Sequence, residues 1–169
     1  PYINNNYDLQ DMLSEFLGEL NGSHTGARYY ASSTVLADAT LGMFYDDTYT
    51  GDGLKVKEII EKSPLTLKKN DVKAGCILEK IDGTAITKDM DYYPLLEGKA
   101  GKKVLLSFYD PQGGKRFDVT IKALSTGAEG SLLYQRWVER NRKMVDKLSD
   151  GKLGYIHIKG MDSPSFRTL

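Results

Sequence analysis

The sequence has few of the residues that would indicate a metal centre, a disulfide framework or a membrane span. Its 169 residues include one cysteine and two histidines, which excludes an internal disulfide and is too few for a structural zinc site. No run of about 18 apolar residues occurs, so we expect no transmembrane segment. Lysine and arginine total 23, as do aspartate and glutamate, and this balance argues against nucleic-acid binding.

What remains is the composition of an ordinary globular chain, with 40% hydrophobic and 27% charged residues. Such a length fits one domain, or one small domain with flanking pieces of another. Residues 8–20 carry apolar side chains at the spacing of an amphipathic helix. Asn5 is a suitable N-cap for this helix, and Asn21 with Gly22 supplies a left-handed stop. Residues 28–35 predict a short strand.

The pattern changes to short β runs over residues 39–124, which indicates a small β-rich domain between two helix-containing flanks. Residues 87–96 predict a short helix, and Pro94 requires that helix to be brief or to start late. Asp82-Gly83 is a tight-turn dipeptide. The predicted strands are residues 41–45, 54–59, 76–81, 103–109 and 116–121.

Beyond Gly127 the apolar spacing is again helical, and Asp150-Gly151 ends the helix. Residues 153–158 are apolar on both faces, as in a strand that enters a covered sheet.

Three features, in this order, resemble the tricorn-like and C-terminal-processing serine peptidases. Residues 17–26 end a helix in a Ser-His pair, residues 41–83 contain the Leu-Gly-Met-Phe and Lys-Ile-Asp-Gly segments of an inserted PDZ domain, and residues 153–158 are similar to the strand that opens the catalytic sheet. The resemblance implies an α+β fold: a PDZ-like small β-barrel or sandwich with a short groove helix, flanked by helices and a strand of an incomplete α/β catalytic domain. The implied boundaries are 1–38, 39–127 and 128–169.

The resemblance makes His24 the general base that deprotonates a serine nucleophile, a role suited to the near-neutral pKa of imidazole. Ser23 would orient that imidazole by hydrogen bonding. The sequence contains no Gly-x-Ser-x-Gly nucleophile elbow, so we expect the serine to lie beyond Leu169. By spacing alone, a surface histidine beside a helix-ending glycine is the favoured interpretation of His24, and only the resemblance reverses that preference.

The segment at 41–44 resembles the carboxylate-binding loop of PDZ domains, in which converging backbone N–H groups hold a peptide's terminal carboxylate. The predicted short helix would form the wall of a pocket for the last side chain of the peptide. Alternatively, residues 41–44 are simply an apolar strand with a bulge, and the predicted short helix is simply part of the core. The predicted peptide contacts are Leu41, Gly42, Met43, Phe44, Tyr93 and Leu96.

The loop at 159–164 follows the expected catalytic strand. The resemblance implies that backbone N–H groups in this region contribute to an oxyanion hole, with Met161 and Asp162 as the candidates. Ser163 and Ser165 are expected to be turn residues and a helix cap rather than nucleophiles.

The resulting hypothesis is a piece of a tricorn-like serine peptidase whose PDZ domain binds peptide or unfolded-protein substrates, without a metal or organic cofactor. The piece alone should be inactive. The alternatives are a non-catalytic PDZ adaptor or scaffold, and a tail-specific peptidase with a Ser-Lys dyad. A homo-oligomeric parent is left open, and we expect an exported or periplasmic location in preference to a cytoplasmic one.

Overall fold

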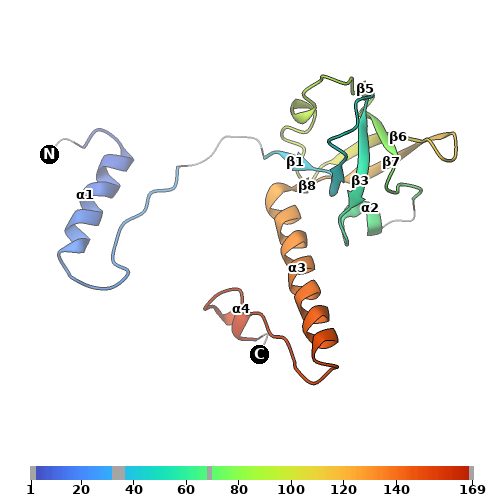
Figure 1. Ribbon diagram of the computed structural model, residues 1–169. Helices are drawn as coiled ribbons and strands as arrows, with labels where there is room; N and C mark the ends of the chain where they lie inside the picture. Colours follow the sequence, from blue (N-terminus) through green and yellow to red (C-terminus); the bar gives the residue numbers. More distant parts are fainter. Residues whose placement is uncertain (1–2, 32–36, 68–69, 168–169) are drawn as a thin grey trace. The chain divides into compact units, whose positions relative to one another are not determined.

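A computed structural model describes residues 3–31, 37–67 and 70–167 (Figure 1). The chain divides into two compact units, Pro1–Val35 and Leu36–Leu169. We call them the helix unit and the sheet unit and describe each by itself.

The helix unit is built around α1, Asn6–Gly18, which begins where the sequence predicts. The Asn5 side-chain oxygen accepts hydrogen bonds from the backbone N–H groups of Tyr7 and Asp8 at 2.8 and 3.0 Å, which satisfies donors that a helix start leaves free. Asn21 has φ 47°, the left-handed conformation expected of the stop. Within residues 28–31 no strand forms, and the rest of the strand predicted over residues 28–35 lies outside the described residues.

The apolar face of α1 is left largely uncovered within the described part of the chain. Leu17 is half-buried. Four other apolar side chains of the helix are between 37% and 69% exposed, and they are Leu9, Met12, Leu13 and Phe16. An amphipathic helix normally buries this face, so α1 carries an interaction surface that the described residues of its own unit do not fill.

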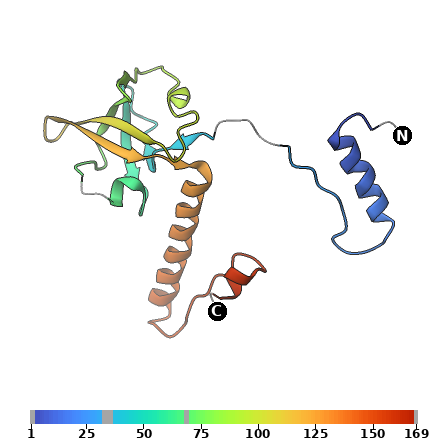
Figure 2. The ribbon, with the colours of Figure 1, turned by 180° about the vertical axis from the view of Figure 1, so that it is seen from behind.

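The sheet unit, seen from behind in Figure 2, contains an antiparallel sheet. Its strand order is β2-β3-β4-β6-β7. The short strand β5, Thr84–Ala85, pairs with β4, and a separate two-stranded sheet joins β1, Ala39–Thr40, to β8, Leu124–Ser125. The α+β class is confirmed, with sheets that stay open in the described residues rather than closing into a barrel. The strands of the main sheet are β2 (Met43–Tyr45), β3 (Leu54–Ile59), β4 (Ile77–Ile81), β6 (Lys103–Asp110) and β7 (Lys115–Lys122).

The core of the sheet unit lies against the central strands. Alternate residues of β6 point inward, and Val104, Leu106 and Phe108 are each 0% exposed, which is the period-two pattern of a half-buried strand. Leu78 and Cys76 are equally buried, so the cysteine packs as a small apolar side chain.

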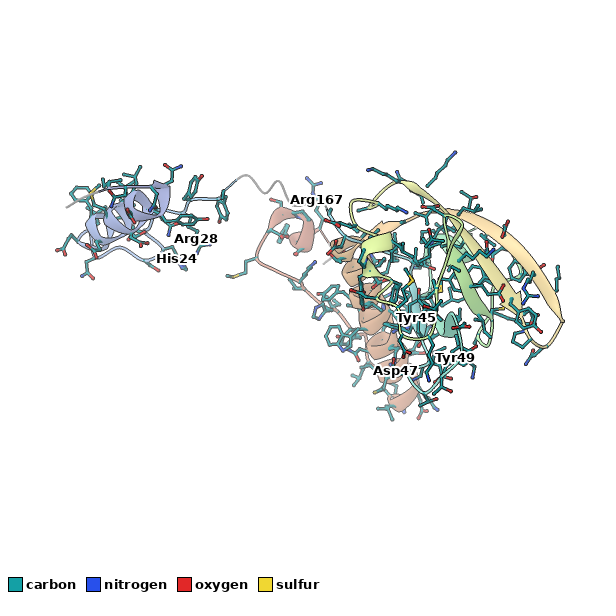
Figure 3. The ribbon with its side chains drawn as sticks, turned by 90° about the horizontal axis from the view of Figure 1, so that it is seen from above. His24, Arg28, Tyr45, Asp47, Tyr49 and Arg167 are labelled. Carbon is teal, nitrogen blue, oxygen red and sulfur yellow. The ribbon has the colours of Figure 1, made fainter. Side chains whose placement is uncertain are left out.

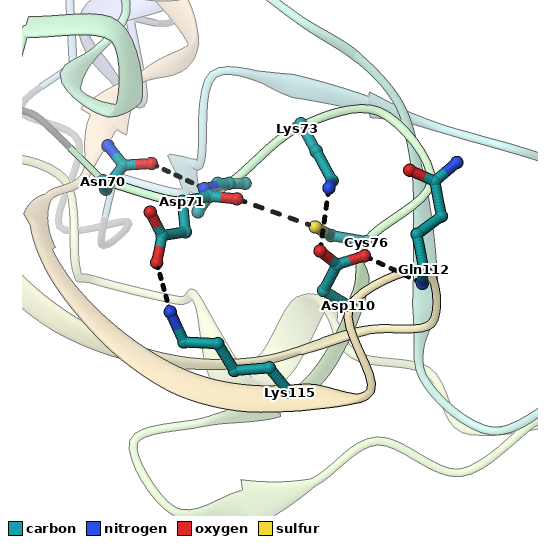
Figure 4. A network of polar contacts seen from close by, with 8 residues as sticks. Asn70, Asp71, Lys73, Cys76, Asp110, Gln112 and Lys115 are labelled. Atoms are coloured by element: carbon teal, nitrogen blue, oxygen red, sulfur yellow. Dashed lines mark hydrogen bonds and ion pairs between the residues drawn. The ribbon is translucent and has the colours of Figure 1, made fainter.

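A polar network fixes the loop before β4 to the far hairpin of the sheet (Figure 4). Lys73 Nζ lies 2.8 Å from Asp110 Oδ2, and Lys115 Nζ lies 2.6 Å from Asp71 Oδ2. Hydrogen bonding from these lysines lowers the pKa of both aspartates. Lys115 and Asp71 are both exposed, so their pair adds little to stability. In the other pair the Asp110 side chain is only 13% exposed, and the two pairs together set the position of the loop.

Two short helical segments connect strands of the sheet unit. α2 is Pro64–Leu67. The helix predicted over residues 87–96 is reduced to the 3-10 turn Tyr93–Leu95. Pro94 explains the reduction, because it has no N–H to donate and tolerates only the first turn of a helix. The Asp91 side chain accepts a hydrogen bond from the Tyr93 N–H at 3.0 Å and so starts the turn.

The long helix α3, Thr126–Leu148, follows β8 directly, with Ser125 as its N-cap. Asp150 and Gly151 have φ 51° and 72° and end it as predicted. Residues 153–158 form no β ladder with any described residue, so the predicted strand is not formed here; a strand needs a neighbour to pair its backbone groups. The segment instead lies beside α3, where His157 Nε2 hydrogen-bonds with the Tyr134 hydroxyl.

Candidate functional site

A groove of about 510 Å³ runs along β2 in the sheet unit. One side is formed by β2 with the segment before it, and the other by the 3-10 turn. The groove is lined by five of the six predicted peptide contacts, which are Leu41, Met43, Phe44, Tyr93 and Leu96. The sixth, Gly42, does not line it. The remaining residues that line it are Ala39, Thr40, Tyr45, Asp47, Lys57, Glu58, Tyr92 and Glu129.

The strand β2 presents a free edge beside this groove. It pairs with β3 on one side, in the register Met43↔Ile59 and Phe44↔Glu58, and it stands at the end of the strand order. No described strand pairs with its other side. An unpaired edge offers a row of N–H and C=O groups to an added extended strand, so the backbone here is able to receive a peptide.

Gly42 shapes the segment that leads into β2. Its φ is +71°, and a Cβ at this position would lie 2.6 Å from Ser63 Cβ, on a residue that is 0% exposed. Only glycine adopts this conformation without strain or overlap. The Gly42 carbonyl accepts a hydrogen bond from the Ile60 N–H at 2.9 Å, which holds the turn against the end of β3. Gly42 therefore positions the loop without lining the groove.

Tyrosines form much of the groove wall. The rings of Tyr92 and Tyr93 stack with centroids 4.6 Å apart, and Tyr45 meets Tyr92 edge-to-face at 5.8 Å. Burial raises the pKa of Tyr45 and that of Tyr92 far above their ordinary value, because removal from water disfavours the phenolate. The phenol groups of Tyr45 and Tyr92 therefore stay protonated near neutral pH.

Sequence reasoning missed several of these lining residues. Tyr45 could have been found, since it shares a strand face with Met43 by the period-two rule. Glu129 could not, because it enters the groove from the first turn of α3, and its place depends on how that helix leaves β8.

The predicted catalytic residues lie in the other unit. Ser23 and His24 are exposed on the loop after α1, and His24 has φ 64°, a strained conformation for a non-glycine residue. Neither side chain makes a hydrogen bond or ion pair within the described residues. Figure 3 shows His24 on the helix unit and Tyr45 on the sheet unit. Their catalytic roles stay a prediction.

The two oxyanion candidates differ in their surroundings. The Met161 side chain is fully exposed. Asp162 is the N-cap of α4, Ser163–Phe166, and its Oδ1 accepts a hydrogen bond from the Ser165 N–H at 2.7 Å. Hydrogen bonding from Ser165 lowers the pKa of this carboxyl. The side chain of Asp162 thus has a structural use, and the oxyanion assignment stays a prediction for the backbone.

The described residues contain no group of three or more His, Cys, Asp or Glu side chains arranged to hold a metal ion. No helix among them is both long enough and apolar enough to cross a bilayer.

Comparison with known proteins gives a consistent result. Residues 46–126 match the family described as the tricorn protease PDZ domain. Over 96% of its length the chain is 31% identical to tricorn protease homolog 1 of Streptomyces coelicolor, and over 95% it is 30% identical to the tricorn protease of Thermoplasma acidophilum. A crystal structure of the tricorn protease matches 98% of the chain with a TM-score of 0.75 and 26% identity. The chain spans only 16%, 15% and 17% of these three proteins.

Proposed function

We propose that the groove of this chain binds peptides as an added strand, and that a serine-type peptidase hydrolyses the bound peptides. The premise of this proposal is that the chain is a PDZ-containing segment of the tricorn-protease type. The observation that carries the proposal is the free edge of β2 beside a groove, because a PDZ domain binds peptides through such an edge. The peptide's terminal carboxylate would lie at the Leu41–Phe44 segment, and its side chains would contact Tyr93 and Leu96.

Peptide binding is tested on the 169-residue chain by amide NMR titration with short peptides that have a free C-terminus. We expect chemical-shift changes along β2 and in the segment before it. The matched control is β7 at the opposite end of the strand order, which should not respond. Peptides with an amidated C-terminus should bind more weakly, since they lack the carboxylate. Equal changes at β2 and β7, or no saturable binding, would reject the proposal.

The catalytic part of the proposal assigns His24 as general base, with Ser23 orienting its ring and a nucleophilic serine supplied from outside these residues. General-base catalysis contributes about 10²–10⁴-fold to rate. His24→Ala in the full-length enzyme should therefore lower kcat/KM by that factor. Thr25→Ala in the same loop, which removes only a hydroxyl bonded to the Gly22 carbonyl at 3.0 Å, is the control and should retain activity.

The adaptor alternative and the Ser-Lys alternative make different predictions in the same assay. Under either, His24→Ala leaves the rate of peptide hydrolysis unchanged. The 169-residue chain alone should not cleave peptides at an enzyme-like rate, and serine-directed inhibition of such cleavage would contradict our assignment of the nucleophile.

A further inference from the structure

The charged side chains that line the groove are not all neutralised by one another. Glu58 is paired with Arg136 of α3, and Arg136 also lies over the Phe44 ring at 5.8 Å from its centroid. Asp47, Lys57 and Glu129 also line the groove, and within the described residues none of these three forms an ion pair. The unpaired groups therefore leave the groove with an excess of one negative charge near neutral pH.

Glu129 is the most confined of the unpaired carboxylates. It is half-buried, whereas Asp47 and Lys57 are exposed. It lies close enough to the phenol groups for its charge to add to the effect of burial in raising the pKa of Tyr45 and of Tyr92. A half-buried carboxylate without a partner is unfavourable, and a cation from a ligand would relieve that cost.

The tyrosine wall favours the same kind of ligand group. Aromatic faces attract ammonium and guanidinium groups, and the attraction grows when the cation is partly removed from water. Tyr92 and Tyr93 present stacked rings to the groove that Glu129 also lines. Glu129 lies in the first turn of α3, where the helix dipole stabilises a negative charge. The dipole alone would account for an acidic residue at this position, but it does not account for the aromatic wall and the groove beside it.

We propose that this groove selects peptides with a lysine or arginine among their last few residues, whose cation lies between Glu129 and the tyrosine wall. Asp47, exposed two residues after the end of β2 and lining the same groove, attracts the same charge from the side open to solvent. The inference rests on the peptide binding proposed above and adds the chemical class of the bound side chain.

The test uses the 169-residue chain and dye-labelled hexapeptides with free C-termini. The peptides are identical and apolar except for Lys, Gln or Glu placed in turn at each of the last four positions. Fluorescence anisotropy should show that at one position the Lys peptide binds roughly tenfold more tightly than the Gln peptide, which corresponds to about 1.4 kcal/mol. The Glu peptide should bind most weakly, and 0.5 M salt should reduce the differences because screening weakens exposed charge interactions.

Variants identify the responsible carboxylate. Glu129→Gln should reduce the Lys-over-Gln preference from about tenfold to about twofold, because loss of one partly exposed charge contact is worth up to about fivefold and the tyrosine wall still attracts the cation. Glu139→Gln is the matched control, because Glu139 is on the same helix, pairs with Arg142 at 3.3 Å and does not line the groove. Lys57→Gln removes the unpaired cation of the groove and should increase the preference. This second variant keeps the test usable if Glu129→Gln does not fold, as judged by circular dichroism.

The outcomes separate the two proposals. If no peptide of the set binds, peptide binding itself fails and the charge selectivity fails with it. If peptides bind but Lys and Gln versions are equal at every position, or if Glu129→Gln keeps the full preference, only the selectivity is overturned. Tighter binding of the Glu peptide would overturn it as well.

Discussion

Replacing Gly42 by alanine should destabilise the sheet unit by about 2–5 kcal/mol, and the structure divides this cost into two parts. A non-glycine residue in the left-handed region costs roughly 1–2 kcal/mol, and φ at Gly42 is +71°. The added methyl group would also lie 2.6 Å from Ser63 Cβ, and forcing extra volume into a packed site costs about 1–3 kcal/mol. Since a whole domain is stable by about 5–15 kcal/mol, the loss is large.

Gly114 is the matched control for the conformational part alone. Its φ is +60°, and a Cβ there would meet no atom within 4 Å. Gly114→Ala should therefore cost only about 1–2 kcal/mol. The difference between the two variants measures the overlap with Ser63.

The single cysteine provides the assay. Cys76 is 0% exposed in the core of the sheet unit, so a brief pulse of thiol reagent labels only unfolded molecules. With a urea m-value of about 2 kcal/mol/M, the labelling midpoint should move down by about 1–2.5 M for Gly42→Ala and by less for Gly114→Ala. Equal midpoint shifts for the two variants would refute the steric argument, and an unchanged midpoint for Gly42→Ala would refute both parts.

Three other changes test separate features of the sheet unit. Ser63→Ala should change stability by less than about 1 kcal/mol, because the Ser63 hydroxyl is buried without a partner in the described residues and removing such a group is nearly neutral; urea denaturation measures this. Phe108→Ala should cost about 3–5 kcal/mol in the same assay, as a fully buried ring leaves a cavity. Hydrogen bonds from Thr48 and Lys55 lower the pKa of Asp46 to about 2. A carboxyl group whose pKa is lowered by folding stabilises the protein at pH values above its ordinary pKa near 3.9, and this stabilisation is lost as the pH falls towards 2. The destabilisation that Asp46→Asn causes at pH 7 should therefore shrink between about pH 4 and about pH 2. A stability difference between the two proteins that stays constant over this pH range would contradict the assignment.

The strands were predictable where the signal is local. β6 and β7 were expected as a hairpin from alternating side chains on both sides of a glycine-containing turn, and the structure extends each by only a residue or two. The Asp82-Gly83 turn was expected from its residue types, and both residues have positive φ. In such segments the period of the side chains and the backbone preferences of the turn agree, so no distant contact is needed.

Prediction was weaker where a segment depends on what lies beside it. Residues 153–158 have the composition of a strand, but composition does not provide the neighbour whose N–H and C=O groups complete a ladder. The predicted groove helix is only the turn Tyr93–Leu95, because the missing N–H of Pro94 outweighs the helical pattern around it.

By itself the sequence determined the two longer helices, the main strands of the sheet, the glycine-dependent turns and the likeness to a PDZ domain within a tricorn-type segment. Each of these depends on neighbours a few positions apart along the chain. Only the tertiary structure decided that β2 keeps a free edge, that tyrosines from two segments form one wall, and that Glu129 reaches the groove from α3. Those features depend on how distant segments pack, and a pattern of local spacing carries no information about that packing.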